Sequence, residues 1–296
     1  MEQSEREKIL KAGKIASKVR RWSMKLVKAG AKAVDIADEI EAKIIEENGG
    51  LAFPANVCIN DVAAHYAPKH MDKTVLGEGD VVSIDLGVHV DGYIGDTAYT
   101  IDLSAEHPKL LEANQKALDE TLSMIKPGCK VADIGAKVYE TMVDAGYKPI
   151  ENLSGHEVKQ YDLHAGLSIP NIKVPYDWEV EEDMVLAIEP FATDGYGRVI
   201  ESRGAEIYSQ LEPIKTRDRQ LRGVIKHISK REGLPFTSRW YAQKVNPLKL
   251  PILLNQLTQQ DVLKSYPPLR EKEGGCVSQF EHTILVTEKG CVITTE

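Results

Sequence analysis

The residues of this chain best suited to chemistry are four carboxylates in or beside apolar, strand-like runs, together with one histidine. Asp85 and Glu189 each end such a run, Glu281 precedes one, and Asp96 and His156 complete the group. An ionised carboxylate buried without a partner is costly, and too few Lys or Arg residues lie near these runs to pair them all. Carboxylates with a single imidazole suit a pair of divalent cations. Such a pair activates water for hydrolysis.

An internal repeat relates these residues in pairs. The segment KAGAKAVDI at 28–36 recurs as KPGCKVADI at 126–134, and a helical pattern precedes and follows the glycine in both copies. The second helix of each copy is expected over 37–47 and 136–145, where glycine follows. Further positions correspond in the same order: His65 with His164, Asp85 with Glu189, and Asp96 with Glu281. Two similar halves facing each other would bring the four carboxylates to one central seam.

The first two carboxylates are expected on one β-hairpin. Asp91-Gly92 stands between two alternating runs, which is a strong signal for a two-residue turn. In that register position 85 faces 98 and position 87 faces 96. Asp85 and Asp96 are then diagonal neighbours on one face, with backbones about 7–8 Å apart, so that their side chains could reach one ion.

Composition places the chain among ordinary globular proteins. With 296 residues it is long enough for one large domain or two smaller ones. The formal net charge of -8 argues against nucleic acid as the main ligand of the whole chain. The four cysteines are scattered and form no C-x-x-C pair, which favours a reducing compartment. The charged N-terminus is unlike a signal peptide and no apolar run approaches about 18 residues, so we expect a cytoplasmic protein without membrane contact.

A basic stretch from Lys215 to Lys249 stands out from this acidic background. It holds ten Lys or Arg residues and two acidic ones, a net +8, and leaves the rest of the chain at -16. Apolar residues at 221, 224, 225 and 228 have helical spacing, and a second helix is expected over 250–257. We interpret the region as an inserted helical subdomain. Its charge is either a solvated surface or a docking site for polyphosphate such as the ribosome.

The chain resembles type 2 methionine aminopeptidases, which are metallopeptidases of the pita-bread fold. The type 1 relatives lack the long insertion before the last glutamate, and this chain lacks the charged N-terminal extension of eukaryotic type 2 enzymes, so it is similar to the short archaeal form. The matching blocks cover nearly the whole chain in order: LAFP at 51–54, INDVAAHY at 59–66, DVVSID at 80–85, DGYIGD at 91–96, NLSGH at 152–156, LHAG at 163–166, AIEPF at 187–191, SYPPL at 265–269 and QFEHT at 279–283.

The resemblance implies an α+β fold in which two αβ halves, related by a pseudo-twofold, surround a central antiparallel sheet. The catalytic domain would comprise residues 1–191 and 272–296, and the inserted helical subdomain residues 192–271. The implied activity is metal-dependent removal of N-terminal methionine from peptides and nascent proteins, preferentially before a small second residue. A water shared by two divalent ions, Co, Mn, Fe(II) or Zn, would attack the peptide bond. The protein is expected to be a monomer.

The resemblance also assigns roles to individual residues. Asp85 and Glu281 would hold one metal, His156 and Glu189 the other, and Asp96 and Glu281 would bridge both. Glu189 would also move the proton of the water. The residues implied in contact with substrate are His65 and His164 at the scissile peptide and Phe53, Leu163, Phe191, Tyr266 and His282 around the methionine side chain. The remaining histidines, at 70, 89, 107 and 227, are expected to be structural.

Two other functions use the same fold. The first is a related aminopeptidase or proline dipeptidase with the same five ligands, but such dipeptidases usually carry a separate N-terminal domain, and there is no room for one before Gly30. The second is a protein without catalysis that binds RNA or ribosomes. Proteins of that kind lose metal ligands, whereas this chain keeps all five.

Overall fold

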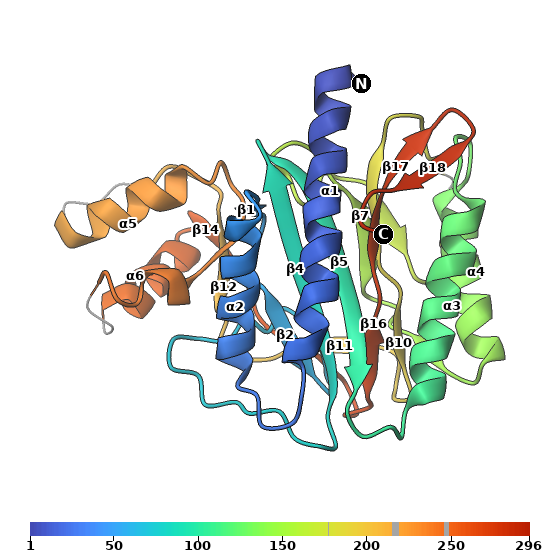
Figure 1. Ribbon diagram of the computed structural model, residues 1–296, viewed down its shortest axis with the longest axis horizontal. Helices are drawn as coiled ribbons and strands as arrows, with labels where there is room; N and C mark the ends of the chain where they lie inside the picture. The colour runs from blue at the N-terminus through green and yellow to red at the C-terminus, as the bar shows by residue number, and fades with distance from the viewer. Residues whose placement is uncertain (177, 215–218, 246–248) are drawn as a thin grey trace.

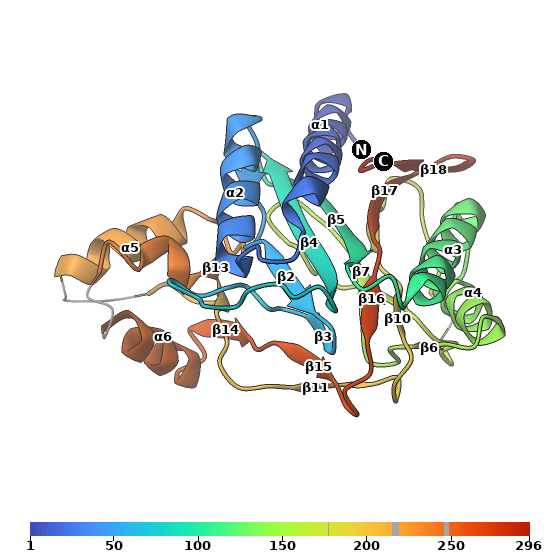
Figure 2. The ribbon, with the colours of Figure 1, turned by 60° about the horizontal axis from the view of Figure 1, so that its bottom comes forward.

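Two pairs of helices cover the outer faces of the molecule, one pair for each half of the repeat. The computed structural model describes residues 1–176, 178–214, 219–245 and 249–296. In Figures 1 and 2, α1 (Gln3–Ser23) and α2 (Ala33–Glu46) lie on one side, and α3 (Pro108–Met124) and α4 (Val131–Asp144) lie on the other. A short 3-10 helix, η1 (Met24–Leu26), follows α1. Within the described ranges, no helix combines the length and apolar character needed to cross a bilayer.

The repeat seen in the sequence is present in the backbone. Gly30 and Gly128 both have positive φ, 84° and 81°, a conformation that glycine adopts without the steric cost of a side chain. Each donates its N–H across 2.8 Å to an equivalent carbonyl, that of Leu76 in the first half and that of Val180 in the second. The helices expected over 37–47 and 136–145 are confirmed within α2 and α4, which begin a few residues earlier.

Each helix pair packs on an antiparallel sheet. In the first, β4 (Val81–Val90) pairs with β1 (Gly50–Leu51), β2 (Asn56–Ile59) and β5 (Tyr93–Asp102). The second runs in the order β18 (Gly290–Ile293), β17 (His282–Thr287), β9 (Val185–Ile188), β7 (Ser154–Glu157) and β8 (Ser168–Pro170). Apolar residues four apart on α2, Ile36, Ile40 and Ile44, pack with β4 in one core, and a second core joins α3 and α4 to β9 and β17.

Two smaller, three-stranded sheets contain residues of both the insertion and the rest of the chain. One contains β16 (Val277–Gln279), β10 (Phe191–Thr193) and β6 (Lys148–Pro149). Another contains β11 (Val199–Glu201), β15 (Leu269–Glu271) and β3 (Val62–Ala64). The second of these binds both ends of the insertion to the first half of the repeat.

The hairpin register expected from the Asp91-Gly92 turn is confirmed. Asp85 faces Ala98 and Gly87 faces Asp96 across β4 and β5. The turn residues have positive φ, 51° at Asp91 and 86° at Gly92, as a two-residue turn of the favoured hand requires. The two aspartates therefore lie on one face of the sheet.

The two halves meet where the carboxylates lie. The backbone N–H of Asp96 donates to Thr283 Oγ1 at 2.8 Å, and Thr97 Oγ1 donates to the carbonyl of Glu281 at 2.8 Å. The N–H of Glu281 in turn donates to the carbonyl of Ala98 at 3.1 Å. β5 of the first half is thus bonded to the segment that carries the last glutamate, and this contact forms the seam.

The insertion has a core of its own and projects from the body of the molecule (Figure 1). The two expected helices are present as α5 (Arg219–Ser229) and α6 (Lys249–Gln259). The insertion is not purely helical, because it also contains η2 (Ser238–Tyr241) and the sheet of β12 (Ile207–Gln210), β13 (Phe236–Thr237) and β14 (Leu263–Tyr266). These strands are too short to show a clear alternation in the sequence. Residues 215–218 and 246–248 of the basic stretch lie outside the described residues.

Candidate active site

The five residues proposed as metal ligands lie together in one cavity of about 220 Å³. His156 Nε2 is 3.3 Å from Glu189 Oε1 and 3.9 Å from Asp96 Oδ2. Asp96, His156 and Glu281 each offer a ligand atom, and these atoms lie within 4.8 Å of one another. Asp85 lies on the same face of the hairpin as Asp96 and lines the same cavity. Asp85 and Glu281, which are 196 positions apart in the sequence, therefore line the same cavity.

Each of these side chains lies on a strand or directly beside one. Asp85 and Asp96 are on β4 and β5, and His156 is on β7. Glu189 directly follows β9 and Glu281 directly precedes β17. Gly155 directly precedes His156 on β7. A Cβ there would lie 2.2 Å from the carbonyl oxygen of Ala187, so glycine lets β7 pack closely on β9 and thereby places His156.

The electrostatics of the cavity favour a bound cation. Burial raises the pKa of Asp85 to about 7. Burial, followed by the charges of neighbouring carboxylates, raises the pKa values of Asp96, Glu189 and Glu281 well above their usual range. Among the described residues that line the cavity, none is Lys or Arg. Four carboxylates grouped in this way, two of them buried and two mostly so, need positive charge from elsewhere to remain ionised.

The donor atoms also fit a metal. One carboxylate oxygen each of Asp85, Asp96 and Glu281 is buried without a hydrogen-bond partner among the described residues. Burial, with a smaller contribution from the neighbouring His164, lowers the pKa of His156 to about 3, so its imidazole is neutral near pH 7 and can act as a ligand. Oxygen donors with one neutral imidazole are a suitable set for divalent ions of the first transition row.

Two further histidines and a tyrosine line the same cavity. The ring of His164 lies 4.4 Å from that of His156 and stacks on Tyr266 at 6.3 Å, while His65 meets Tyr266 edge-on at 5.6 Å. Burial, with a smaller contribution from Lys264, lowers the pKa of His164 to about 4. Burial, with a smaller contribution from His164, lowers that of His65 to about 4. Both imidazoles are therefore neutral near pH 7 and can each donate through one ring nitrogen.

The other side of the cavity is apolar. Phe53, Leu163 and Phe191 line it, as the resemblance implies. Two lining residues that sequence reasoning missed, Ile207 and Pro235, come from the insertion. No local pattern marks either of them, because the fold of the insertion alone carries them to the cavity.

Gln279 is also a lining residue that sequence reasoning missed. Its Nε2 donates to Glu189 Oε2 at 3.3 Å. It stands two positions before Glu281, and side chains two apart along an extended segment point to the same face. That spacing was the signal that could have revealed it.

His282 is the one residue of the expected substrate pocket that the structure places elsewhere. It is absent from the described lining of the cavity, and its ring nitrogens contact Thr295 Oγ1 at 2.8 Å and Arg20 Nη1 at 3.4 Å. Successive residues of an extended segment point to opposite faces, so Glu281 facing the cavity turns His282 toward α1. The structure therefore places His282 outside the described lining of the pocket, against Thr295 and Arg20.

Gly87→Ala should impair substrate binding without removing any proposed ligand. An added Cβ at this position would lie 2.2 Å from Cε1 of Phe53, so the ring must move within the cavity. We expect KM for a peptide substrate to rise about tenfold or more, in line with the 1–3 kcal/mol typical of overpacking. Steady-state kinetics with elemental analysis of bound metal would measure this. Unchanged KM at full metal content would show that Phe53 does not contact the substrate.

Duplicated αβ halves around buried carboxylates and an imidazole define a metal-dependent hydrolase. The chain matches the model of metallopeptidase family M24 over residues 7–288 and belongs to this family. The methionine aminopeptidase of Thermococcus onnurineus is 47% identical over 294 residues, which cover 98% of this chain and 99% of that protein. The methionine aminopeptidase of Archaeoglobus fulgidus is 39% identical, with 100% of both chains covered.

Solved structures agree on the fold. The methionine aminopeptidase of Thermotoga maritima matches with a TM-score of 0.74 at 24% identity, covering 100% of this chain and 98% of that chain. The α+β pita-bread architecture implied by the sequence is thereby confirmed. As a member of a metallopeptidase family the protein is an enzyme that acts on peptides with a divalent metal.

Proposed function

We propose that this enzyme removes the N-terminal methionine from peptides and nascent proteins, preferentially when the second residue is small. The observation that carries the proposal is the single cavity that combines five candidate metal ligands with an apolar wall of Phe53, Leu163 and Phe191. Its volume of about 220 Å³ lies below the roughly 300–1,000 Å³ of sites for drug-sized ligands, which suits one terminal residue. An unbranched thioether suits such an apolar pocket.

Two divalent ions would be held in the arrangement that the resemblance implies. Asp85 and Glu281 would bind one ion, His156 and Glu189 the other, and Asp96 and Glu281 would be shared. When bound, such ions polarise a carbonyl and bring the pKa of water toward neutrality. Co, Mn, Fe(II) and Zn all suit this donor set, because sites rich in carboxylate accept several metals.

The residues around the ions would transfer the proton and bind the peptide group. Glu189 accepts a proton from the attacking water and delivers it to the leaving amine. His164, neutral because its pKa is lowered to about 4 by burial and the charge of Lys264, donates a hydrogen bond to the scissile carbonyl as negative charge develops there. His65 holds the amide on the leaving side. Tyr266 packs against both imidazoles and fixes their orientation.

A peptide assay tests this function. We expect the purified enzyme to release methionine from Met-Gly peptides, to lose activity with a chelator and to regain it with a divalent ion. Release of proline-linked dipeptides instead of methionine would favour a dipeptidase. Absence of bound metal and of any hydrolysis would favour a binding protein without catalysis.

The insertion, residues 192–271, would form a subdomain apart from a catalytic domain of 1–191 and 272–296. The core that joins α5, α6 and β14 supports this division. On α5, Leu221, Val224 and Ile228 are buried, while Arg222 and Lys226 are exposed. The buried side packs on the insertion, and the basic side faces solvent. We propose that this basic side docks the enzyme on the ribosome, where new N-termini emerge in the cytoplasm, and that the protein acts as a monomer.

Reversing three exposed charges on this surface, Arg222, Lys226 and Lys230, to glutamate should weaken ribosome co-sedimentation and spare hydrolysis of a short peptide. Three lost phosphate contacts lower the slope of log K against log salt by about 2–3. The matched control reverses Lys109, Lys116 and Lys289, which are exposed on other elements and give the same change in net charge. Equal effects of both triple variants, or no binding by the wild type at low salt, would leave the basic side as a solvated surface.

A further inference from the structure

Arg231 of the insertion binds main-chain atoms on two separate parts of the chain. Its Nη2 donates to the carbonyls of Leu51 at 2.9 Å and Ala52 at 3.3 Å in the catalytic part. The same guanidinium donates to the carbonyls of Leu234 at 3.2 Å and Pro235 at 2.6 Å within the insertion. Burial lowers its pKa to about 10. A rigid, planar group with several donors can hold all these carbonyls at once, which a lysine ammonium cannot.

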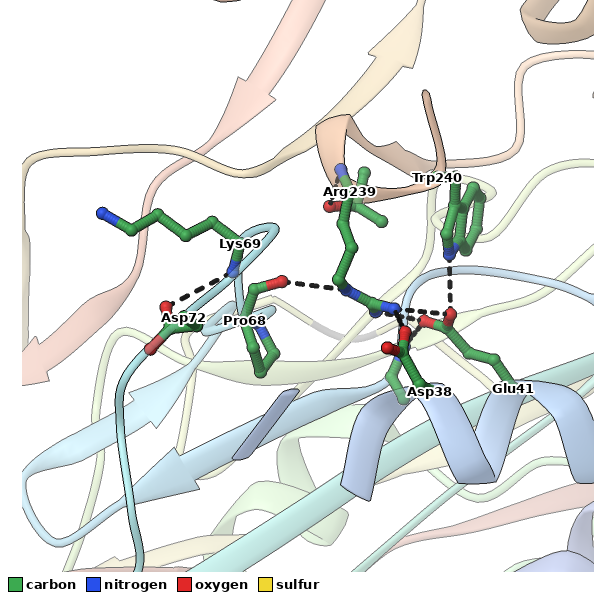
Figure 3. A network of polar contacts seen from close by, with 9 residues as sticks. Asp38, Glu41, Pro68, Lys69, Asp72, Arg239 and Trp240 are labelled. Atoms are coloured by element: carbon green, nitrogen blue, oxygen red, sulfur yellow. Dashed lines mark hydrogen bonds and ion pairs between the residues drawn. The ribbon is translucent and has the colours of Figure 1, made fainter. Parts of the chain in front are cut away.

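Arg239 makes a second connection between the same two regions (Figure 3). Its guanidinium donates to both carboxylate oxygens of Glu41 on α2 at 2.7 and 3.0 Å, to Asp38, and to the carbonyl of Pro68 at 2.9 Å. The side chains of Arg239 and Glu41 are 4% and 8% exposed, so this ion pair is shielded from water.

Glu41 is the link from this ion pair to the substrate cavity. It accepts a hydrogen bond from the backbone N–H of Ala55 at 3.1 Å and another from Trp240 Nε1 at 2.7 Å. The loop after Phe53 and the insertion residues at 239–240 are thus bound to one carboxylate. The Trp240 ring also lies 4.8 Å from the guanidinium of Arg231, so the two arginines form one connected group.

Both segments joined by these arginines carry a wall of the cavity. The first, residues 51–55, contains Phe53, and the second, residues 231–240, contains Pro235. Between them Leu234 packs with Phe53 and Leu163 in one apolar cluster. The distance between the two walls therefore depends on hydrogen bonds made behind the walls, away from the cavity.

We propose that Arg231 and Arg239 are positioning residues for substrate selection, which fix the spacing between the Phe53 and Pro235 walls. This inference rests on the proposed methionine substrate. The insertion then has a role in specificity: it supplies one wall of the pocket and keeps that wall in register with the catalytic domain. Neither arginine lines the cavity or belongs to the proposed metal ligands.

The test is competition between Met-Gly and Leu-Gly peptides with identical remaining sequences in one reaction. The ratio of the two rates gives the ratio of kcat/KM and does not depend on the fraction of enzyme that is folded. We expect Arg231→Met to lower the preference for methionine about tenfold, at the lower end of what pocket shape can discriminate. KM for the methionine peptide should rise more than kcat falls.

Conservative variants extend the test. Arg231→Lys and Arg239→Lys keep the charge but make fewer hydrogen bonds, so each should lose part of the preference for methionine. Because they keep the charge, they should remain soluble even if Arg231→Met does not. The matched control is Arg198→Met, because Arg198 is half exposed and pairs with Glu151 on the surface. Bound metal, measured by elemental analysis, should stay at the wild-type level in all four variants.

The outcomes separate the two proposals. If the wild type prefers methionine and the arginine variants keep the wild-type ratio, whatever their stability, the positioning role alone is overturned. A wild type that releases no methionine would overturn the proposed function as well. A lower ratio in Arg198→Met equal to that in Arg231→Met would also contradict the assignment.

Discussion

Glu281→Gln should abolish hydrolysis by the metal-loaded enzyme and at the same time stabilise the metal-free protein at neutral pH. Glu281 is a proposed ligand of both ions, and one of its oxygens is buried without a partner among the described residues. Changes to groups that only orient ligands cost roughly 10–100-fold in affinity or activity, so losing a shared ligand should cost more. Without metal this carboxyl group lies beside three others and must keep a proton to avoid their repulsion, whereas the amide of the variant is neutral at every pH.

The stabilisation should depend on pH with a defined sign. Burial, and then the charges of Asp96 and the other carboxylates, raise the pKa of Glu281 above its usual 4.5. The folded chain therefore keeps a proton that the unfolded chain releases, and stability is lost as pH rises above about 4.5. Glu281→Gln has no carboxyl group at this position, so it does not lose stability in this way as pH rises. The gain in Tm over the wild type should be near zero at pH 4 and grow toward pH 8, by about 2–4 °C for each kcal/mol relieved.

Glu271→Gln is the matched control, because this glutamate also has little exposed surface but has an opposite environment. Although burial acts to raise its pKa, backbone N–H groups of Tyr196, Gly197, Glu273 and Gly275 hold that pKa below its usual value. The control should lose stability, with or without metal, and keep its metal content. Calorimetry across pH and elemental analysis measure both variants. Full metal content and activity in Glu281→Gln would refute the shared-ligand assignment.

His164→Ala should lower kcat about 10²–10³-fold while changing KM far less. The imidazole is neutral near pH 7, since burial and the charge of Lys264 lower its pKa to about 4. A neutral donor strengthens its hydrogen bond only as charge develops on the scissile carbonyl, so its loss is felt in the transition state. Because the group does not titrate above about pH 5, the ratio of wild-type to variant rates should be constant from pH 6 to 8.

Two further variants distinguish this role from a structural one. His164→Gln keeps a donor and should restore part of kcat. His89→Ala removes a histidine whose pKa is also lowered to about 4, by burial and by Arg231, but which lies outside the cavity lining, so it should leave kcat close to wild type. A change in His164→Ala confined to KM, at full metal content, would instead mean simple substrate binding.

The sequence by itself determined the features that depend on neighbouring residues. Asp91-Gly92 imposes a turn, and the turn fixes the register that places Asp85 and Asp96 on one face. Gly30 and Gly128 lie in the turns that precede equivalent helices, because the same positive φ is needed in both halves. The period of two in a strand would also have excluded His282 once Glu281 was assigned to the cavity. Local sterics and spacing suffice for all of these.

The tertiary structure decided which distant segments close the cavity. Ile207 and Pro235 reach it from the insertion, and no pattern near either residue indicates a pocket. In the sequence, Arg231 is one of several charged residues in a basic stretch. In the structure, its guanidinium binds the carbonyls of Leu51 and Ala52, about 180 positions away. Carbonyl acceptors carry no side-chain signature in a sequence. Such contacts follow only from how the insertion packs on the catalytic core, because they depend on the whole fold rather than on neighbouring residues.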